Sequence, residues 1–403
     1  MYLKKKIYNK WLIDSKFNYK NKNMENNNSV CYMATINEIK PIVGADNIEL
    51  AVVGGWNCIT QKGVQNVGDV VIIATTDAVI PEFLSDEMGV TNYLRKGGRV
   101  RTVKLRGVYS ECLIIPHKFL HGRTTMGDWD LGDGSDCMHI FGIVKFEPPV
   151  KMVQLASGRK IRYQDNPNFH VYYKFPNLKN VPDLFTEEDE VEITRKIHGT
   201  NARYGIVKKI RLSFWDNVKD FFGFGNKWNW YEFVVGSHNV EKGSDSNGFY
   251  DTNVWYDIEK KYDIKAKLWK YVQLSEPDLI GDGITLYGEI YGAGIQKGYD
   301  YGLKDIEFVG FDIKKNGEYL DSLTSISIIA NILELPYVEI LHYGNWSQEV
   351  QDKFTFNNFI PNTKVPEEGI VIKHLTGARE KTAKVINPDY LIFAEKHNVG
   401  DSH

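Results

Sequence analysis

The sequence predicts an α+β protein in which a small all-β domain precedes a larger domain that mixes strands with a few helices. Two observations support this fold class. Between residue 29 and about residue 149, short β-prone runs alternate with Gly, Asp and Pro, which is typical of a small barrel or sandwich. Farther along, strand-like runs surround one clear helix over residues 321–335, whose apolar face is expected to hold Leu323, Ile326, Ile329, Ala330 and Leu333.

The same patterns divide the chain into four parts. Residues 1–28 are rich in Lys and Asn without apolar periodicity, so a flexible tail is expected there. The small all-β domain then covers residues 29–149. Residues 150–185, punctuated by Pro and Asn, are expected to connect it to the larger domain of residues 186–403. The strands expected in the first domain are residues 30–36, 49–53, 70–74, 100–105 and 111–115.

Composition excludes several classes of protein. With 403 residues, 42% hydrophobic and 25% charged, the chain is long enough for two ordinary domains. Its net charge of -3 gives no general attraction to nucleic acid, so any such binding must come from local basic surface. No apolar run approaches the roughly 18 residues of a membrane helix, and a cytoplasmic protein is expected. Four scattered cysteines without a C-x-x-C pair predict buried thiols: Cys31, Cys58, Cys112 and Cys137.

The most informative stretch is Lys196-Ile197-His198-Gly199-Thr200-Asn201. It lies between two β-prone runs, residues 191–194 and 202–207, so Lys196 is expected at the end of a strand with a tight turn after it. That position would present an amine to a pocket. Lys-x-x-Gly alone is a common pattern, and a solvated lysine before a turn is by far its more frequent explanation. Its meaning depends on four further blocks, which follow in order over residues 286–292, 307–313, 368–373 and 381–386.

Taken in order, the five blocks resemble motifs I, III, IIIa, IV and V of the covalent nucleotidyltransferases, the superfamily of ATP-dependent ligases and mRNA capping enzymes. The His-Gly-Thr-Asn form of the first motif is similar to that of nick-sealing RNA ligases of the phage RNA ligase 2 type, whereas DNA ligases usually carry Asp where His198 stands. Residues 41–51, 67–71 and 142–149 look like the N-terminal OB-fold domain of the RNA ligase 5 family. The resemblance implies an OB-fold β-barrel followed by a mixed α/β nucleotidyltransferase (adenylyltransferase) domain with antiparallel sheets.

The resemblance also implies a function. The chain is expected to be an ATP-dependent RNA ligase that seals 3′-hydroxyl/5′-phosphate nicks through a lysyl-AMP intermediate in RNA repair. Its partner would be nicked or broken RNA, as a duplex or an RNA–DNA hybrid, bound by a monomer. ATP, with AMP covalently on Lys196, and Mg²⁺ or Mn²⁺ would be the cofactors.

Chemistry sets a condition on Lys196. Its reference pKa of about 10.4 leaves only about one amine in a few thousand neutral at pH 7, so the pocket must be electropositive. The resemblance assigns that charge to Lys373 and Lys384, which would contact the nucleotide phosphates, and to Lys381, which with Lys384 would assist the first step. The family usually spaces its motif V pair as Lys-x-Lys, and this chain departs from that spacing.

The remaining roles come from the same resemblance. Asn201 and Glu289 would contact the nucleotide, Glu289 through the ribose hydroxyls or a metal-bound water, and Phe311 would stack on adenine. Glu368 would hold the metal, with Glu289 as a second metal contact, because hard carboxylate ligands suit Mg²⁺ or Mn²⁺. His198 would serve the later sealing steps. In Gly236-Ser237-His238-Asn239 many relatives place Arg at His238, which leaves its role open.

Two surface features have alternative interpretations. A basic run is expected to form a β-ribbon that tracks phosphates, with Arg99 and Arg101 on one side, or else a solvated face. The aromatic residues of 213–233 are expected to pack as a helix and turn, with a base-stacking platform as the alternative. The basic run consists of Arg95, Lys96, Arg99, Arg101, Lys104 and Arg106.

Three other functions remain open from sequence alone. DNA ligases and capping guanylyltransferases share these motifs, but they normally place an OB domain after motif V, where about 19 residues follow Lys384. A guanylyltransferase would also form a GMP adduct. A nucleic-acid-binding protein on a dead scaffold would be expected to lose its charged site residues. Those residues are present in this chain: Lys196, Glu289, Glu368 and Lys373.

Overall fold

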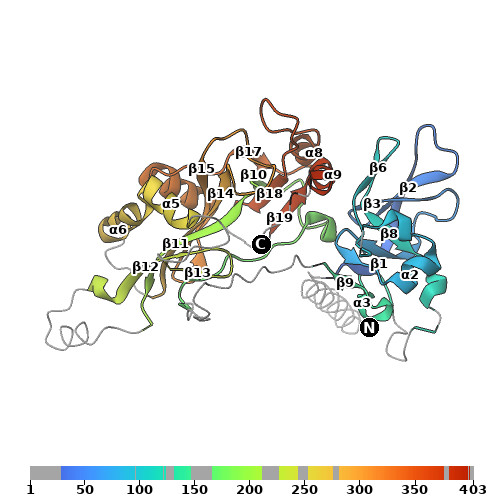
Figure 1. Ribbon diagram of the computed structural model, residues 1–403, viewed down its shortest axis with the longest axis horizontal. Helices are drawn as coiled ribbons and strands as arrows, with labels where there is room; N and C mark the ends of the chain where they lie inside the picture. The colour runs from blue at the N-terminus through green and yellow to red at the C-terminus, as the bar shows by residue number, and fades with distance from the viewer. Residues whose placement is uncertain are drawn as a thin grey trace, which may run out of the picture. The chain divides into compact units, whose positions relative to one another are not determined.

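The computed structural model describes residues 29–95, 97–120, 122–123, 131–146, 166–210, 227–243, 253–275, 281–375, 381–397 and 399. The expected tail of residues 1–28 lies outside them. The chain forms two compact units (Figure 1), one made of Met1–Glu147 with Leu178–Pro182 and the other of Pro148–Asn177 with Asp183–His403. Within the described ranges, no helix has the length and apolar character to span a membrane.

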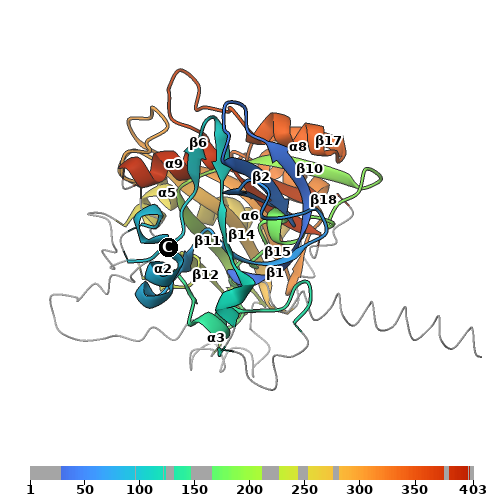
Figure 2. The same ribbon diagram turned by 90° about the vertical axis from the view of Figure 1, so that its right-hand side faces the viewer.

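A curved antiparallel sheet forms the first unit (Figure 2). Its long strand β1 pairs with β4 through its first half and with β2 through its second, and the register shifts between Ile36 and Glu38. Such an irregularity bends a strand, and here it turns the sheet into a nearly closed barrel in which β3 contacts β8. The N-terminal OB-fold prediction is confirmed. The strand order is β3-β2-β1-β4-β8, with β1 Cys31–Pro41, β2 Ile48–Val53, β3 Trp56–Gln61, β4 Val70–Thr75 and β8 Cys112–Ile115.

Short elements close the first unit. Two apolar clusters fill it, one including Ile72, Leu84 and Phe141 and the other including Ile36 and Val53. All four cysteines are free and buried, as the sequence predicted. The short elements are β5 Ala78–Val79 paired with β9 Val144–Lys145, β6 Val103–Leu105 paired with β7 Val108–Ser110, α2 Glu82–Met88, α3 Met138–Phe141, η1 Thr91–Tyr93, η2 His117–Leu120 and η4 Leu178–Asn180.

Two antiparallel sheets build the second unit, and the chain crosses from one to the other directly after Lys196. Strand β10 lies in a four-stranded sheet of order β17-β10-β18-β19, and β11 lies in a six-stranded sheet of order β13-β12-β11-β14-β15-β16. Lys196 therefore ends one sheet at the point where the other begins. The strands are β10 Glu190–Lys196, β11 Thr200–Lys208, β12 Tyr231–Gly236, β13 Glu241–Lys242, β14 Gly283–Gly292, β15 Ile306–Lys315, β16 Glu318–Tyr319, β17 Ile340–Asn345, β18 Gly369–His374 and β19 Thr382–Ile386.

Helices α5 and α6 pack on one face of the six-stranded sheet (Figure 1) and bury apolar residues such as Tyr204 and Leu286. Alternation along the strands leaves Asn201 and Glu289 on the opposite face. The remaining helical bounds are α5 Val254–Tyr262, α6 Ile264–Ser275, α7 Ser322–Ile326, η5 Lys227–Trp230, the π-helical η6 Ser327–Ile332, α8 Gln348–Thr355 and α9 Pro388–His397.

The helix predicted over residues 321–335 is present as α7 and η6, but its predicted buried face is wrong in the first turn. Leu323 is 56% exposed, whereas Ser322 and Ser325 are buried together with Ile329. The π-helical segment holds more residues per turn than an α-helix, so the first turn is rotated relative to the last.

Residues 166–177, expected to be part of a connector, pack within the second unit. The Tyr172 hydroxyl donates to Asp312 Oδ2 at 2.9 Å, and the Lys384 backbone N–H donates to the Pro176 carbonyl at 2.9 Å. Residues 178–182 belong to the first unit, where Lys179 forms an ion pair with the buried Glu111.

Much of the expected aromatic segment, residues 211–226, lies outside the described ranges. Of the remainder, Trp228 packs edge-on against Trp269 of α6, with ring centroids 6.3 Å apart. Phe233 packs against the same apolar core. These contacts favour the packing interpretation for the described part of the segment.

Candidate active site

Lys196, the last residue of β10, lies beside an acidic side chain and shares a sheet face with two other lysines. Its Nζ donates to Glu368 Oε1 at 2.7 Å. In the antiparallel register, Glu192 of β10 pairs with Lys373 of β18. Thr194 of β10 pairs with Val371 of β18, which in turn pairs with Lys384 of β19. Because cross-strand partners point to the same side of a sheet, Lys373 and Lys384 share a face with Lys196. The expected nucleophile thus has a carboxylate partner and basic neighbours.

The turn after Lys196 requires glycine at position 199. A Cβ there would lie 2.1 Å from the Ile290 carbonyl oxygen and 3.0 Å from Glu289 Cγ, so a larger residue would push β14 away. The close approach also lets the Gly199 backbone N–H bond to the Glu289 carboxylate. The motif I glycine is therefore explained by the contact between this turn and β14.

Glu289 is a partly buried carboxyl group opposite Asn201 on the neighbouring strand. Burial raises the pKa of Glu289 to about 8; the positive charge of Lys196 opposes this shift, and the negative charge of Glu368 adds to it. The Asn201 Oδ1 atom is buried without a hydrogen-bond donor among the described residues. Two polar groups that the sequence singled out therefore lie side by side, with capacity to bind a polar ligand.

The raised pKa predicts how stability depends on pH in the metal-free protein. Between about pH 4.5 and about pH 8, folded Glu289 keeps a proton that the unfolded chain releases, so stability falls as pH rises. Glu289→Gln removes this titration. Thermal unfolding in EDTA from about pH 5 to about pH 9 should therefore show the variant gaining on wild type up to about pH 8 and holding a constant advantage above it. A gap that stays constant over the whole range would contradict the prediction.

Glu368, just before β18, has one oxygen engaged and one without a hydrogen-bond partner. Oε1 accepts from Lys196, whereas Oε2 is buried without a hydrogen-bond donor among the described residues and lies 3.8 Å from His198 Nδ1. A buried carboxylate oxygen without a donor is suited to a cation. In the described ranges no group of three or more His, Cys, Asp or Glu side chains could hold a metal alone. Mg²⁺ commonly takes one or two carboxylates, waters and substrate phosphates, and Glu368 fits that kind of site.

His198 is enclosed by tyrosines next to Glu368. Its ring lies 3.2 Å from the Tyr390 hydroxyl and makes edge-on contacts with Tyr299 and Tyr390. Tyr390 belongs to α9, beyond the last motif, and sequence analysis did not single it out. Nothing in its sequence neighbourhood indicates that α9 packs against the motif I histidine. The position of His238 is simpler, since it lies in the turn that joins β12 and β13.

Lys373 occupies a different place from the phosphate contact that the resemblance implied. It is 2% exposed, and its Nζ donates to the Phe311 carbonyl at 2.7 Å. The same amine lies 3.7 Å from Asp312 Oδ2 and 4.0 Å from Glu192 Oε1, two fully buried carboxylates. Lys373 therefore joins the two sheets and holds the strand segment that carries Phe311.

Phe311 lies where the register of β15 shifts against β14, so it is the extra residue of an irregular pair. Its ring is partly exposed and makes an edge-on contact with Tyr172 at 5.0 Å. A partly exposed ring whose backbone carbonyl is held by a hydrogen bond is a suitable surface for a planar base.

Lys381 and Lys384 lie on opposite faces of the sheet. Lys381 Nζ donates to Asp189 Oδ1 at 2.6 Å, and His374 Nε2 lies 3.2 Å from the same oxygen. Residues three apart on a strand point to opposite sides, so only Lys384 shares the face of Lys196. The structure does not bring Lys381 to the site, and the spacing Lys-x-x-Lys already contained that signal.

This difference predicts unequal effects of two alanine substitutions. Lys384→Ala should slow lysyl-adenylate formation by about 100-fold, because it removes a positive charge from the reacting face. Lys381→Ala should change that rate by less than about threefold, since its partly exposed ion pair with Asp189 lies on the other face. Single-turnover adenylylation of both variants tests this. Equal losses would contradict the assignment.

The side chains of the basic run in the first unit differ in how far they are exposed. Arg99 forms an ion pair with Asp77 and lies 3.9 Å from the Phe146 ring centroid. Arg101 Nε donates to the Tyr93 carbonyl at 3.3 Å, and Arg95 pairs with Arg99 through backbone groups. Lys104 and Arg106 are exposed at the β6–β7 hairpin, where Lys104 Nζ also donates to the Tyr109 hydroxyl at 2.7 Å. Lys96 is not among the described residues. The hairpin is therefore the best candidate in this run for contacting a phosphate backbone.

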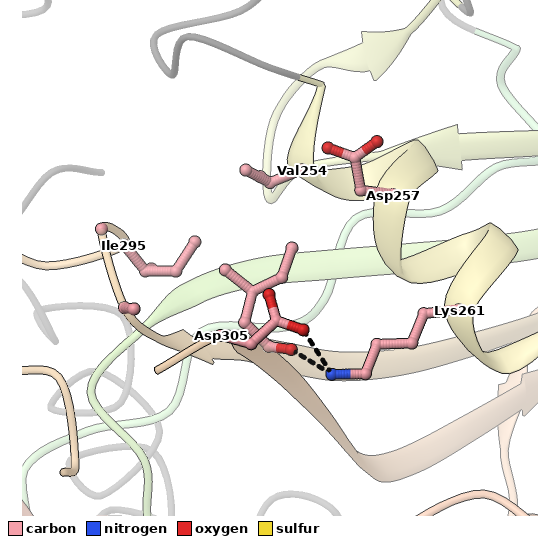
Figure 3. A pocket seen from close by; sticks show the side chains of 8 residues that line it. Val254, Asp257, Lys261, Ile295 and Asp305 are labelled. Carbon is pink, nitrogen blue, oxygen red and sulfur yellow. Dashed lines mark hydrogen bonds and ion pairs between the residues drawn. The ribbon is translucent and has the colours of Figure 1, made fainter. Parts of the chain in front are cut away.

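A hollow of about 590 Å³ lies beside α5 (Figure 3). Its wall includes Asp257 and Ile295, together with Lys261, whose Nζ lies 3.1 Å from Asp305 Oδ2. None of the residues predicted for the site lines it. A second hollow of about 420 Å³ is lined by the loop that follows β14.

The lysine, its buried carboxylate partner and a ring suited to a base lie on two packed sheets that follow an OB-fold unit in sequence. These features define the covalent nucleotidyltransferase class. Residues 189–386 match the family model described as RNA ligase, and residues 30–117 match a model described as an OB-fold domain. The chain thus carries an RNA ligase domain preceded by an OB-fold domain. No curated protein matches the chain.

Several solved structures of an RNA ligase from Naegleria gruberi share this fold. A mutant with ATP and Mn is 23% identical, with a TM-score of 0.66 over 92% of this chain and 99% of that chain. The form with PPi is 22% identical, with a TM-score of 0.65 over 92% and 99%. An apo mutant is 24% identical, with a TM-score of 0.66 over 92% and 98%. The likeness spans both domains in the same order.

Proposed function

We propose that this chain is an ATP-dependent RNA ligase that joins a 3′-hydroxyl to a 5′-phosphate at a nick through a lysyl-AMP intermediate. The observation that carries the proposal is Lys196 Nζ held 2.7 Å from Glu368 Oε1, on the sheet face that also carries Lys384. The RNA ligase family match and the Naegleria structures with ATP, AMP and Mn support it. They do not favour a DNA ligase or a capping enzyme.

The first step forms a bond between Lys196 Nζ and the α-phosphorus of ATP, while the bond to the β-phosphate bridging oxygen breaks and pyrophosphate leaves. The amine must lose its proton. The negative charge of Glu368 favours the charged amine, so the ligand-free site is not yet prepared for attack. A divalent cation on Glu368 would offset that charge and neutralise the phosphates. Lys384 adds a further positive charge to the same face.

The second step uses the same phosphorus, and the third uses the phosphorus of the RNA 5′-phosphate. In the second step the RNA 5′-phosphate attacks the α-phosphorus, the bond to Lys196 breaks, and AMP becomes linked to the RNA end. The 3′-hydroxyl then attacks the RNA phosphate and AMP leaves. His198, which is buried beside Glu368 at the Lys196 turn, would act in these steps, and Phe311 would hold adenine throughout.

The proposal also covers the RNA partner, the oligomeric state and the location of the protein. The β6–β7 hairpin, with exposed Lys104 and Arg106, would contact the RNA backbone of a duplex or an RNA–DNA hybrid. We further propose that the protein is a monomer, that it is located in the cytoplasm and that it acts in RNA repair.

The decisive experiment incubates purified protein with α-³²P-ATP or α-³²P-GTP and Mg²⁺ or Mn²⁺, followed by denaturing electrophoresis. Wild type should be labelled from ATP only, and Lys196→Ala should not be labelled. Label from GTP would indicate capping chemistry instead. Absence of label from either nucleotide, with pre-bound AMP excluded by mass spectrometry, would support the binding-protein alternative. Labelled enzyme is then given nicked all-RNA, hybrid and all-DNA duplexes, and sealing of DNA alone would contradict the RNA assignment.

A further inference from the structure

We infer that Gln296 and Tyr301, two residues outside the motifs, are positioning residues that hold the turn behind Lys196 in the geometry for attack on ATP. This inference rests on the proposed function. Both residues belong to the segment that follows β14, about 100 positions from Lys196 in sequence. Neither has a role in the motifs that the chain shares with the nucleotidyltransferases.

The turn needs partners from outside because it leaves one sheet and enters another. Its peptide groups between β10 and β11 have no ladder neighbours, and buried peptide groups without partners are costly. The His198 backbone N–H donates to the Tyr301 hydroxyl at 2.6 Å. The Gly199 carbonyl accepts from Gln296 Nε2 at 2.6 Å, in a buried position. Together with the bond between Gly199 N–H and Glu289, three side chains fix two consecutive residues of the turn.

The backbone at Tyr301 indicates that this contact is specifically maintained. Its φ is +58°, in the left-handed region that a bulky residue rarely adopts, and such strain persists where surrounding contacts determine it. The ring is packed edge-on between Tyr291 and Tyr299, with centroids 5.1 and 5.0 Å away. The hydroxyl that bonds to the turn thus belongs to a side chain packed between two other aromatic rings.

Gln296 and Tyr301 are together called the clamp. Gln296 is carried by the loop that follows β14. The loop that carries Gln296 also contributes Gly294 and Ile295 to the hollow of Figure 3. Gln296 itself is 3% exposed and reaches inward to Gly199. One loop thus borders an open hollow while its glutamine holds the turn.

The clamp acts on geometry, because both bonds are made to peptide groups of the turn. In-line attack depends on the position of the amine to a fraction of an ångström, so a looser turn lowers the rate of the chemical step. ATP binding relies on other groups, including Phe311 and Asn201. Loss of the clamp should therefore lower the rate constant of lysyl-adenylate formation, whereas the ATP concentration that gives half of the maximal rate should change little.

The test uses the full chain with Tyr301→Phe and Gln296→Leu. Tyr301→Phe removes only the hydroxyl that accepts from His198, and Gln296→Leu removes the donor to Gly199 while keeping similar volume. Each should lower the single-turnover rate constant of lysyl-adenylate formation about tenfold or more, with half-saturating ATP changed less than about twofold. The pH profile of that rate should keep its shape, because the clamp does not titrate near neutral pH.

Matched controls remove comparable groups elsewhere. Tyr256→Phe deletes a hydroxyl that donates to the Lys242 carbonyl, and Gln351→Leu changes a buried glutamine of α8. Both should adenylylate like wild type even where melting temperature falls. Thermal unfolding of all four variants confirms folding, and the two clamp variants are independent tests.

The outcomes separate this inference from the proposed function. If the wild-type protein forms no lysyl-adenylate, both the proposed function and the clamp are wrong. Wild type that adenylylates, with both clamp variants within about twofold of its rate constant, would overturn only the clamp. Losses that appear as weaker ATP binding, or that the controls share in proportion to their destabilisation, would also overturn it.

Discussion

Replacing Glu368 by glutamine should lower the rate of lysyl-adenylate formation by about 1000-fold. The substitution keeps the size of the side chain but removes the charge that binds Lys196 Nζ through Oε1 and the oxygen available to a cation through Oε2. Loss of one preorganised electrostatic group at a reacting phosphate typically costs about 100- to 1000-fold, and here the metal contact is lost as well. Single-turnover adenylylation with labelled ATP measures the effect, and raised Mg²⁺ should recover part of it.

The neighbouring residue provides a close control. Glu367 is also buried and acidic, but it forms an ion pair with Arg195. Arg195 alternates with Lys196 along β10 and so points to the other face of the sheet. Glu367→Gln should change the adenylylation rate by less than about threefold while lowering stability. A wild-type rate in Glu368→Gln would remove Glu368 from the mechanism.

Replacing Lys373 by methionine should have the largest effect on stability. Methionine retains much of the volume, but it leaves Glu192 and Asp312 as buried carboxylates without their shared cation and frees the Phe311 carbonyl. Removing one partner of a buried ion pair costs about 3–5 kcal/mol of unfolding free energy. Urea unfolding of the full chain, followed by intrinsic fluorescence, should show an earlier transition of the ligase domain. ATP binding should weaken too, because the Phe311 segment is no longer held.

A second substitution tests the reason for that loss. Adding Glu192→Gln to Lys373→Met removes one of the two stranded charges, so the double variant should be more stable than Lys373→Met alone. Glu192→Gln in the wild-type background should instead be destabilising. If Lys373→Met unfolds at the same urea concentration as wild type, the buried network contributes nothing measurable.

The motifs in the sequence were sufficient to predict the two-domain fold and the acidic residues that lie near Lys196. Glu289 and Glu368 meet the lysine because each lies on or beside a strand whose pattern is readable locally. Lys373 was assigned to the nucleotide on resemblance, and its contact with the Phe311 carbonyl could not be predicted, since it depends on how two sheets pack. The sequence analysis also missed strand β3. This strand mixes polar and apolar residues directly after two glycines and contains no long β-prone run.

The positions that sequence could not supply share a physical cause. Gln296, Tyr301 and Tyr390 act through single hydrogen bonds to distant groups, and such bonds leave no periodicity or spacing in the chain. Lys381 is the opposite case. A lysine three positions before Lys384 on a strand must point to the other face, so alternation alone could have removed it from the predicted site.

The packing of residues 166–177 has a practical consequence for dividing this enzyme into fragments. A ligase-domain fragment that begins at residue 186, the boundary drawn from sequence, would lose the Tyr172 hydroxyl that bonds the buried Asp312. It would also lose the Pro176 carbonyl that accepts from the Lys384 N–H. Truncation there would remove the outer support of the proposed adenine surface at Phe311 and of strand β19 together. A fragment that begins before Asn166 keeps both, so the cloning boundary itself decides whether an isolated ligase domain retains the proposed nucleotide site.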